Sequence, residues 1–220
     1  MVFHVVYLVR HGETEWNSVR RYQGWGDAPL TERGLAQAKA VGRVLAEISA
    51  AATAQIISSP LGRARRTAEI IGSALGNRAP ILFDERLKEI SIGVWDGLHR
   101  DEIEAIEPGI FDRYGYGEWY FRCPGGETYA GFAARRGSWL NEEFSGARIV
   151  ITHGIVTRVL RGLYAGLPRA TALRLPVPQG VIWRLAGGPN RGDHNPRSRK
   201  SSVHSGSKLS RRRATRDCRA

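Results

Sequence analysis

An apolar run near the N-terminus stops abruptly at an arginine, a histidine and a glycine. Residues 5–9 read Val-Val-Tyr-Leu-Val, and Arg10, His11 and Gly12 follow them directly. A short apolar run without alternation is typical of a strand buried on both faces of a parallel sheet, beneath helices. The chain is therefore expected to begin with a buried strand that ends in residues suited to anion binding and nucleophilic chemistry.

Two later stretches repeat this arrangement. Residues 148–151 form an apolar run that leads into His153 and Gly154, and residues 55–58 form another that leads into Ser59-Pro60. Ser59 is the predicted N-cap of a helix that begins at Pro60 and carries Arg63 in its first turn. Ligands of open parallel sheets bind outside the carboxyl ends of the strands. Imidazoles, guanidiniums and helix N-termini at one such edge predict an anion site, for a phosphoryl group.

Helical periodicity separates the strands. Apolar residues recur at helical spacing over 35–48, after a predicted N-cap at Thr31, and again over 64–75 and 155–163. Residues 81–83 and 180–185 are further short strand candidates. Strands alternating with helices predict an α/β fold, a three-layer α/β/α sandwich around a mostly parallel sheet.

The net charge of +12 is concentrated at the C-terminus. From Pro189 onward ten Lys/Arg face two Asp, so this segment carries +8 of the total. It has no apolar face and is rich in Arg, Ser and Gly, which predicts disorder. We expect a single catalytic domain over 1–187 and a basic tail over 188–220. The tail leaves open a non-enzymatic function, polyanion binding, although no specific nucleic-acid partner is expected, because aromatics are not interleaved with its charges.

Few features bear on the compartment. Cys123 and Cys218 are too few for a disulfide framework. The N-terminus lacks the pattern of a signal peptide, and no apolar run approaches the roughly 18 residues of a membrane span. The expectation is a cytoplasmic protein that does not bind membranes; no exposed heptad or stripe predicts its oligomeric state.

Several ordered blocks together carry a family resemblance. They are Arg10-His11-Gly12-Glu13-Thr14 with Asn17, Gln23-Gly24, residues 27–31 with Gly34 and Gln37, Ser58-Ser59-Pro60 with Arg63 and Thr67, Glu89 four residues before Gly93, residues 124–128, and Thr152-His153-Gly154. In this order, over roughly residues 2–185, they resemble the histidine phosphatase superfamily, the phosphoglycerate-mutase-like enzymes.

The resemblance implies a mechanism built on His11. This residue would be the nucleophile and form a phosphohistidine, which divides hydrolysis into two easier steps. Arg10, Arg63 and His153 would hold the phosphoryl oxygens, and Asn17 would add a neutral hydrogen bond. Gly12 and Gly154 would let the backbone approach the phosphate.

Glu89 would serve as the general acid and then as the base for water. Asp84, Glu85 and Asp96 lie close by, and a solvated acid or helix cap is the alternative for any one of these acids. Gln23 and Gly24 either contact substrate or form only a turn. No metal and no cofactor is expected, because arginines would neutralise the charge and no metal-ligand spacing is present.

The resemblance allows a phosphatase or a cofactor-dependent mutase. Mutases of the family carry Glu-Arg-His-Tyr where this chain has Glu89-Ile90-Ser91-Ile92, and they have a longer insertion with an Arg-Arg pair. A mutase needs more cations near its site, so the departure favours a metal-independent phosphomonoester hydrolase acting on a small phosphorylated metabolite. The insertion here, about 98–136, is short and aromatic. It is predicted either to form a lid over the active site, with Trp16, Trp25 and Trp95, or to be the core of a small subdomain.

Overall fold

The computed structural model describes residues 4–76 and 80–186, and its centre is a five-stranded sheet. The strand order is β3 (Leu82–Phe83), β2 (Gln55–Ser58), β4 (Gly146–Thr152), β1 (His4–Arg10) and β5 (Ile182–Ala186). All neighbouring pairs are parallel except β1 and β5, which are antiparallel. The prediction of a mostly parallel sheet is confirmed.

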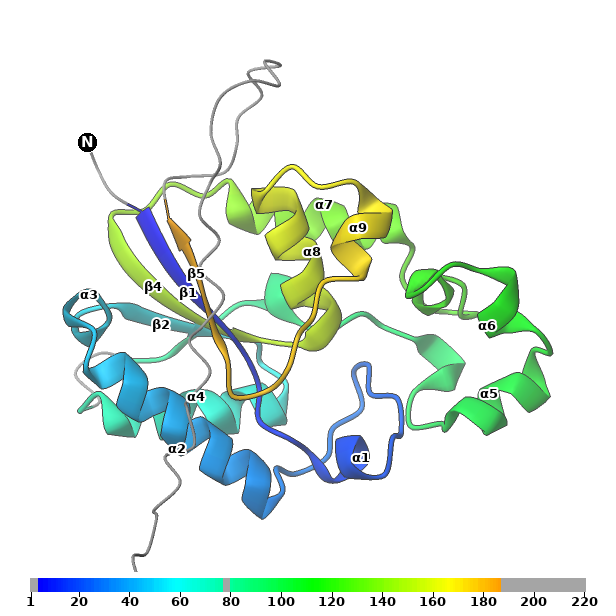
Figure 1. The fold of residues 1–220 in the computed structure, drawn as a ribbon, viewed down its shortest axis with the longest axis horizontal. Helices are drawn as coiled ribbons and strands as arrows, with labels where there is room; N and C mark the ends of the chain where they lie inside the picture. The colour runs from blue at the N-terminus through cyan, green and yellow to red at the C-terminus, as the bar shows by residue number, and fades with distance from the viewer. Residues whose placement is uncertain (1–3, 77–79, 187–220) are drawn as a thin grey trace, which may run out of the picture.

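Helices cover both faces of the sheet (Figure 1). On one face Val5, Tyr7 and Val9 pack with residues of α2 (Glu32–Ala46) and α4 (Gly62–Ala74). On the other face Val6 and Leu8 pack with α7 (Tyr129–Leu140) and α8 (Gly154–Tyr164). Because side chains alternate along a strand, the unbroken apolar run of β1 supplies both cores. The three-layer α/β/α prediction is confirmed.

The register of the sheet brings three strand ends level with one another. Arg10 of β1 pairs with Thr152 of β4, and Ser58 of β2 pairs with Ile151. The next amide of each neighbouring strand continues the ladder: His11 N donates to Thr152 O at 2.9 Å, and Ser59 N donates to Ile151 O at 2.9 Å. The residues after β1, β2 and β4 therefore meet at one edge.

The insertion is a small unit with its own apolar cluster. It contains α5 (Arg100–Ile106), α6 (Ile110–Arg113) and the 3₁₀ helix η3 (Glu118–Phe121), and it lies beside the sheet layers in Figure 1. Ile103, Ile110, Trp119 and Cys123 are buried there with Trp95. Phe111, Tyr114 and Tyr120 are partly buried against this cluster.

Short elements complete the described part of the chain: α1 (Glu15–Ser18), α3 (Ser49–Ala52), α9 (Arg169–Leu173), and the 3₁₀ helices η1 (Glu85–Leu87) and η2 (Gly93–Trp95). None of the helices described is both long and apolar enough to cross a membrane. The predicted basic tail lies outside the described residues.

One helix start was predicted correctly and one was not. Thr31 caps α2, since its side chain accepts a hydrogen bond from Gly34 N at 3.0 Å. The helix after β2 begins at Gly62, with Leu61 as an N-cap that makes no side-chain bond, so the prediction of a start at Pro60 capped by Ser59 was wrong. Ser59 Oγ accepts from Leu61 N at 3.3 Å and also contacts the His153 ring at 2.7 Å, but the first turn of the helix is capped by Asp27, whose Oδ1 accepts from Arg63 N at 3.2 Å.

Candidate active site

His11 is buried at the end of β1 and its ring is fixed in one tautomer. Its exposed fraction is 3%, and its Nδ1 lies 2.7 Å from Gly12 O. A carbonyl oxygen can only accept, so Nδ1 carries the proton and Nε2 keeps its lone pair. The imidazole is therefore arranged as a nucleophile through Nε2.

The surroundings of His11 keep the ring neutral. Burial lowers its pKa well below 6.5, and the nearby charges of Arg63 and Arg10 lower it further. Burial and two cations both disfavour the imidazolium. A neutral imidazole at the end of β1 is thus a property of the fold.

The loop after α1 holds Arg63 in place. Its Nη1 donates to Gly26 O at 2.8 Å and to Asp27 Oδ1 at 3.2 Å, and its Nη2 donates to Gly24 O at 2.7 Å. Asp96 pins the same loop by accepting from Gly24 N at 2.8 Å and from Gly26 N. Arg63 is almost fully buried, and its charge is close enough to His11 to lower the pKa of that ring.

His153 faces His11 from the end of β4. The two ring centroids are 5.2 Å apart, and His153 is fully buried with Nε2 bonded to Ser59 Oγ. Burial lowers the pKa of His153 well below 6.5, with Arg63 as the largest charge contribution. Its Nδ1 has no hydrogen-bond partner among the described residues, and His153 is not among the residues that line the cavity in front of His11.

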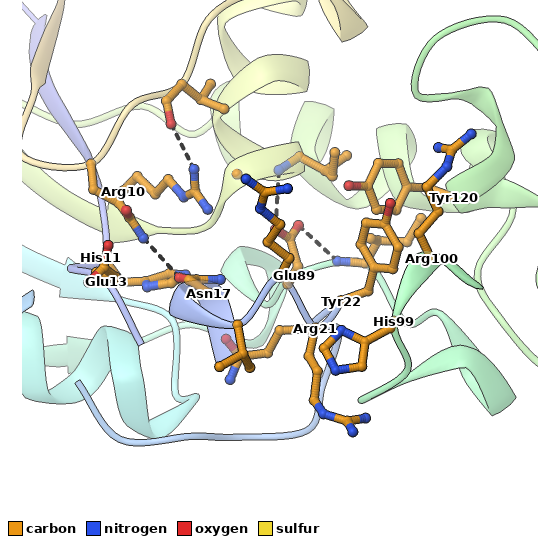
Figure 2. Close-up of a pocket in the computed structure, with 18 of the residues that line it drawn as sticks. Arg10, His11, Glu13, Asn17, Arg21, Tyr22, Glu89, His99, Arg100 and Tyr120 are labelled. Carbon is orange, nitrogen blue, oxygen red and sulfur yellow. Dashed lines mark hydrogen bonds between the residues drawn. The ribbon is translucent and has the colours of Figure 1, made fainter. Parts of the chain in front are cut away.

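Glu89 opens onto the same cavity as His11. Its exposed fraction is 6%, and its carboxylate accepts from Ile90 N at 3.0 Å and from Ile155 N at 3.1 Å (Figure 2). Arg10 is half-buried nearby; its Nη1 donates to Val177 O at 2.8 Å, and Glu89 partly offsets the lowering of its pKa by desolvation. Of the four acids in this stretch, the structure brings Glu89 to the cavity wall.

The structure places the remaining candidates differently from one another. Asn17, Gln23 and Gly154 line the cavity, whereas Gly12 and Gly24 do not. A methyl group on Gly12 would lie 2.4 Å from Gly34 O, so this glycine is required for backbone packing. Gly24 supports Arg63 through its carbonyl, and Gln23 Oε1 accepts from Thr14 Oγ1 at 3.0 Å while still facing the cavity.

The cavity in front of His11 has a volume of about 610 Å³ and a partly cationic outer wall. Tyr22, Arg100, Tyr120 and Arg158 line it, and Figure 2 shows Tyr22, Arg100 and Tyr120 on the side away from His11. The sequence reasoning missed these side chains as individual residues. The aromatic composition of residues 98–136 was the available signal for Tyr120; nothing in the sequence pointed to Arg158. Trp95 is buried in the insertion core, and neither Trp16 nor Trp25 belongs to the cavity wall.

The part of the chain that the structure describes contains no group of three His, Cys, Asp or Glu side chains placed to hold a metal ion. The polar groups gathered at the strand ends are instead guanidiniums and neutral imidazoles beside one carboxylate. This set can bind a phosphoryl group, attack it and exchange a proton with it.

Known proteins share both the sequence pattern and the fold. A sequence profile of the histidine phosphatase superfamily (branch 1) matches residues 6–194. The Salmonella choleraesuis protein named "Probable phosphoglycerate mutase GpmB" is 41% identical over 184 residues, which are 82% of this chain and 83% of that protein.

Solved structures agree with the profile. Bacillus stearothermophilus YhfR has a TM-score of 0.73 at 33% identity, covering 82% of this chain and 90% of that one. A mycobacterial glucosyl-3-phosphoglycerate phosphatase, in complex with VO3, has a TM-score of 0.68 at 29% identity, covering 84% and 92%. On its motifs, its fold and these comparisons, the chain belongs to the histidine phosphatase superfamily.

Proposed function

We propose that this protein is a metal-independent phosphomonoester hydrolase that acts on a small phosphorylated metabolite through a phosphohistidine. The observation that carries the proposal is the state of His11. Its Nδ1 is bonded to Gly12 O, its ring is neutral beside two arginines, and it shares one cavity with Glu89. A nucleophile, an oxyanion site and a proton donor are the parts that phosphoryl transfer to a side chain requires.

The first step forms the phosphohistidine. His11 Nε2 attacks phosphorus as the bond to the leaving oxygen breaks, and protonated Glu89 gives its proton to that oxygen. Arg10, Arg63 and His153 stabilise the charge on the other phosphoryl oxygens. The alcohol product leaves, and Glu89 is left as a carboxylate.

The second step returns the enzyme to its starting state. The Glu89 carboxylate takes a proton from water as the water oxygen attacks phosphorus. The phosphorus–nitrogen bond breaks, and inorganic phosphate is released. His11 is again a neutral imidazole with its Nδ1 proton on Gly12 O, and Glu89 is again protonated.

A mutase is the second candidate, and one observation favours it. The sequence argument against a mutase relied on the lack of cations after Glu89. Ile90 does line the cavity there, but Arg100 and Arg158 supply positive charge to the same cavity from the insertion and from α8. A substrate with a second anionic group could bind to these arginines. The relative named as a phosphoglycerate mutase supports this candidate too.

A substrate panel with EDTA tests the proposal. Glycerol phosphate and 3-phosphoglycerate are incubated with the protein, with and without 2,3-bisphosphoglycerate, and released phosphate and 2-phosphoglycerate are measured. We expect phosphate release that His11→Ala lowers by at least about 1,000-fold. His4→Gln, at the opposite end of β1, is the matched control and should retain activity.

Two outcomes would refute the hydrolase. One is phosphate release that requires a divalent metal. The other is bisphosphate-dependent formation of 2-phosphoglycerate without net phosphate release, which would establish the mutase.

A further inference from the structure

The segment that carries Glu89 has no regular secondary structure of its own. Residues 88–92 lie between η1 and η2 and belong to no helix or strand. Backbone amides and carbonyls in such a segment need partners from elsewhere in the molecule. The position of the Glu89 carboxylate therefore depends on what holds this backbone.

The guanidinium of Arg135 on α7 donates to four backbone carbonyls, two in this segment and two just before it. Its Nη1 donates to the carbonyls of Lys88 at 3.1 Å, Arg86 at 3.2 Å and Glu85 at 3.4 Å. Its Nη2 donates to Glu89 O at 3.0 Å. The side chain is only 20% exposed, so these bonds are largely shielded from water.

Glu127 holds the other side of the segment and also holds Arg135. Its Oε2 accepts from Ser91 N at 2.9 Å, and its own amide donates to Ser91 O at 2.9 Å. Its Oε1 accepts from Arg135 Nε at 2.7 Å, and Oε2 lies 2.5 Å from Arg135 Nη2. A doubly bonded, half-buried ion pair of this kind is geometrically specific. The Glu127–Arg135 pair therefore binds the backbone on both sides of the Glu89 side chain.

The side chain of Glu89 has two anchors, and only one of them is on its own segment. Oε1 accepts from Ile90 N, and Oε2 accepts from Ile155 N in the first turn of α8. A shift of the segment would separate these two donors. The carboxylate would then lose its alignment with the cavity in front of His11.

We infer that Glu127 and Arg135 form a positioning unit for the general acid, setting the place of the Glu89 carboxylate relative to His11. The inference rests on the proposed function. Neither residue lines the cavity, so the unit acts through Glu89 and not on the substrate. Loss of the unit should therefore slow most the substrates whose leaving oxygen needs a proton.

Two substrates separate positioning from general structural damage. An alkyl phosphate such as glycerol phosphate needs a proton on its leaving oxygen, whereas p-nitrophenyl phosphate has a leaving group that departs as the anion. For Glu127→Gln and Arg135→Met we expect kcat/KM on glycerol phosphate to fall about 10- to 100-fold, with kcat/KM on p-nitrophenyl phosphate nearly unchanged. The double variant should lose little more than either single one, because the two side chains act as one unit.

A burst of nitrophenol provides a second readout. A displaced Glu89 is also a weaker base for water, so phosphohistidine hydrolysis should slow and a burst should appear in the variants. Arg135→Lys, which keeps a charge and part of the bonding, should recover some of the glycerol phosphate activity. Arg86→Met is the matched control, since the Arg86 side chain bonds outward to Asp84 and Glu142.

The inference is overturned if the variants lose activity equally on both substrates, or if the isosteric Glu127→Gln leaves kcat/KM on both substrates unchanged. Failure of the proposed function has a different signature: the unaltered protein itself would show no hydrolysis that depends on His11.

Discussion

The neutrality of two buried imidazoles has a thermodynamic consequence at the scale of single residues. His11 and His153 both have pKa values well below 6.5 in the folded protein, because burial and nearby arginines exclude the charged form. In the unfolded chain the same rings take up protons near pH 6.5. The unfolded state thus binds more protons as the pH falls below that value, and stability is lost in the same range.

We expect the melting temperature to fall between pH 7 and pH 5. Each of these imidazoles removes up to about 1.4 kcal/mol of unfolding free energy per pH unit below 6.5, until its folded pKa is reached. His153→Gln should flatten this dependence, as measured by calorimetry across the range. His99→Gln, at the cavity wall, serves as the control and should leave the slope as it is. If the melting temperature falls equally with pH in the unaltered protein, in His153→Gln and in His99→Gln, the lowered pKa of His153 is contradicted.

A second residue-scale prediction concerns Gly34, where two backbones touch. A methyl group there would lie 2.0 Å from Glu13 O, in the loop that follows the nucleophile. Gly34→Ala is expected to lower stability by about 1–3 kcal/mol or more, since the loop has to move, and to lower kcat with it. Gly137→Ala on α7 has nothing within 4 Å of the added methyl and should be neutral or slightly stabilising. Chemical denaturation of both proteins makes the comparison.

At the scale of elements, the loop from Gln23 to Asp27 connects Asp96 to Arg63. Asp96 accepts from the amides of Gly24 and Gly26, and the carbonyls of the same two residues accept from Arg63. Asp96, which does not line the cavity, thus helps to hold the loop that binds the guanidinium of Arg63.

Asp96→Ala should therefore weaken both stability and activity. Each buried amide left without an acceptor costs about 1–3 kcal/mol, and in a chain of this size 1 kcal/mol corresponds to about 2–4 °C in melting temperature. We expect kcat/KM to fall for alkyl and aryl phosphates alike, because Arg63 serves the phosphoryl group and not the leaving group. Asp112→Asn, an exposed acid on α6, is the control. Loss confined to alkyl phosphates would argue against this account.

The sequence was most informative where one strand supplies both packing and chemistry. The apolar run before His11 predicted β1 and its double burial, because few other structures bury every residue of a short segment. The start of α4 was misplaced because its first turn is capped by Asp27, a residue 36 positions away. The cations of the outer wall were missed for the same reason: Arg100 and Arg158 reach the cavity only through the way the insertion and α8 are placed.

At the scale of the whole molecule, the sheet, both helix layers and the cavity all lie within residues 4–186. The family profile continues slightly further, to residue 194, which is past the domain boundary of 187 expected from composition. The predicted tail carries most of the net charge, and its role stays a prediction.

Truncation tests that boundary. Chains ending at His194 and at Gly188 should both retain phosphatase activity on glycerol phosphate, and both should lose binding to a polyanion such as heparin. Activity present at His194 but absent at Gly188 would move the boundary to the end of the family match. Heparin binding that survives both truncations would place it on the body of the protein.

Arg63 of α4 is held by carbonyls and a carboxylate of the loop after α1, so its charge is in place before any substrate arrives. A site prepared in this way suits both the phosphoryl group of the substrate and the inorganic phosphate that is released. We therefore expect inorganic phosphate to inhibit competitively and to raise the melting temperature as its concentration rises. The rate of such an enzyme would then fall as the phosphate concentration around it rises, so that its own product would be its simplest regulator.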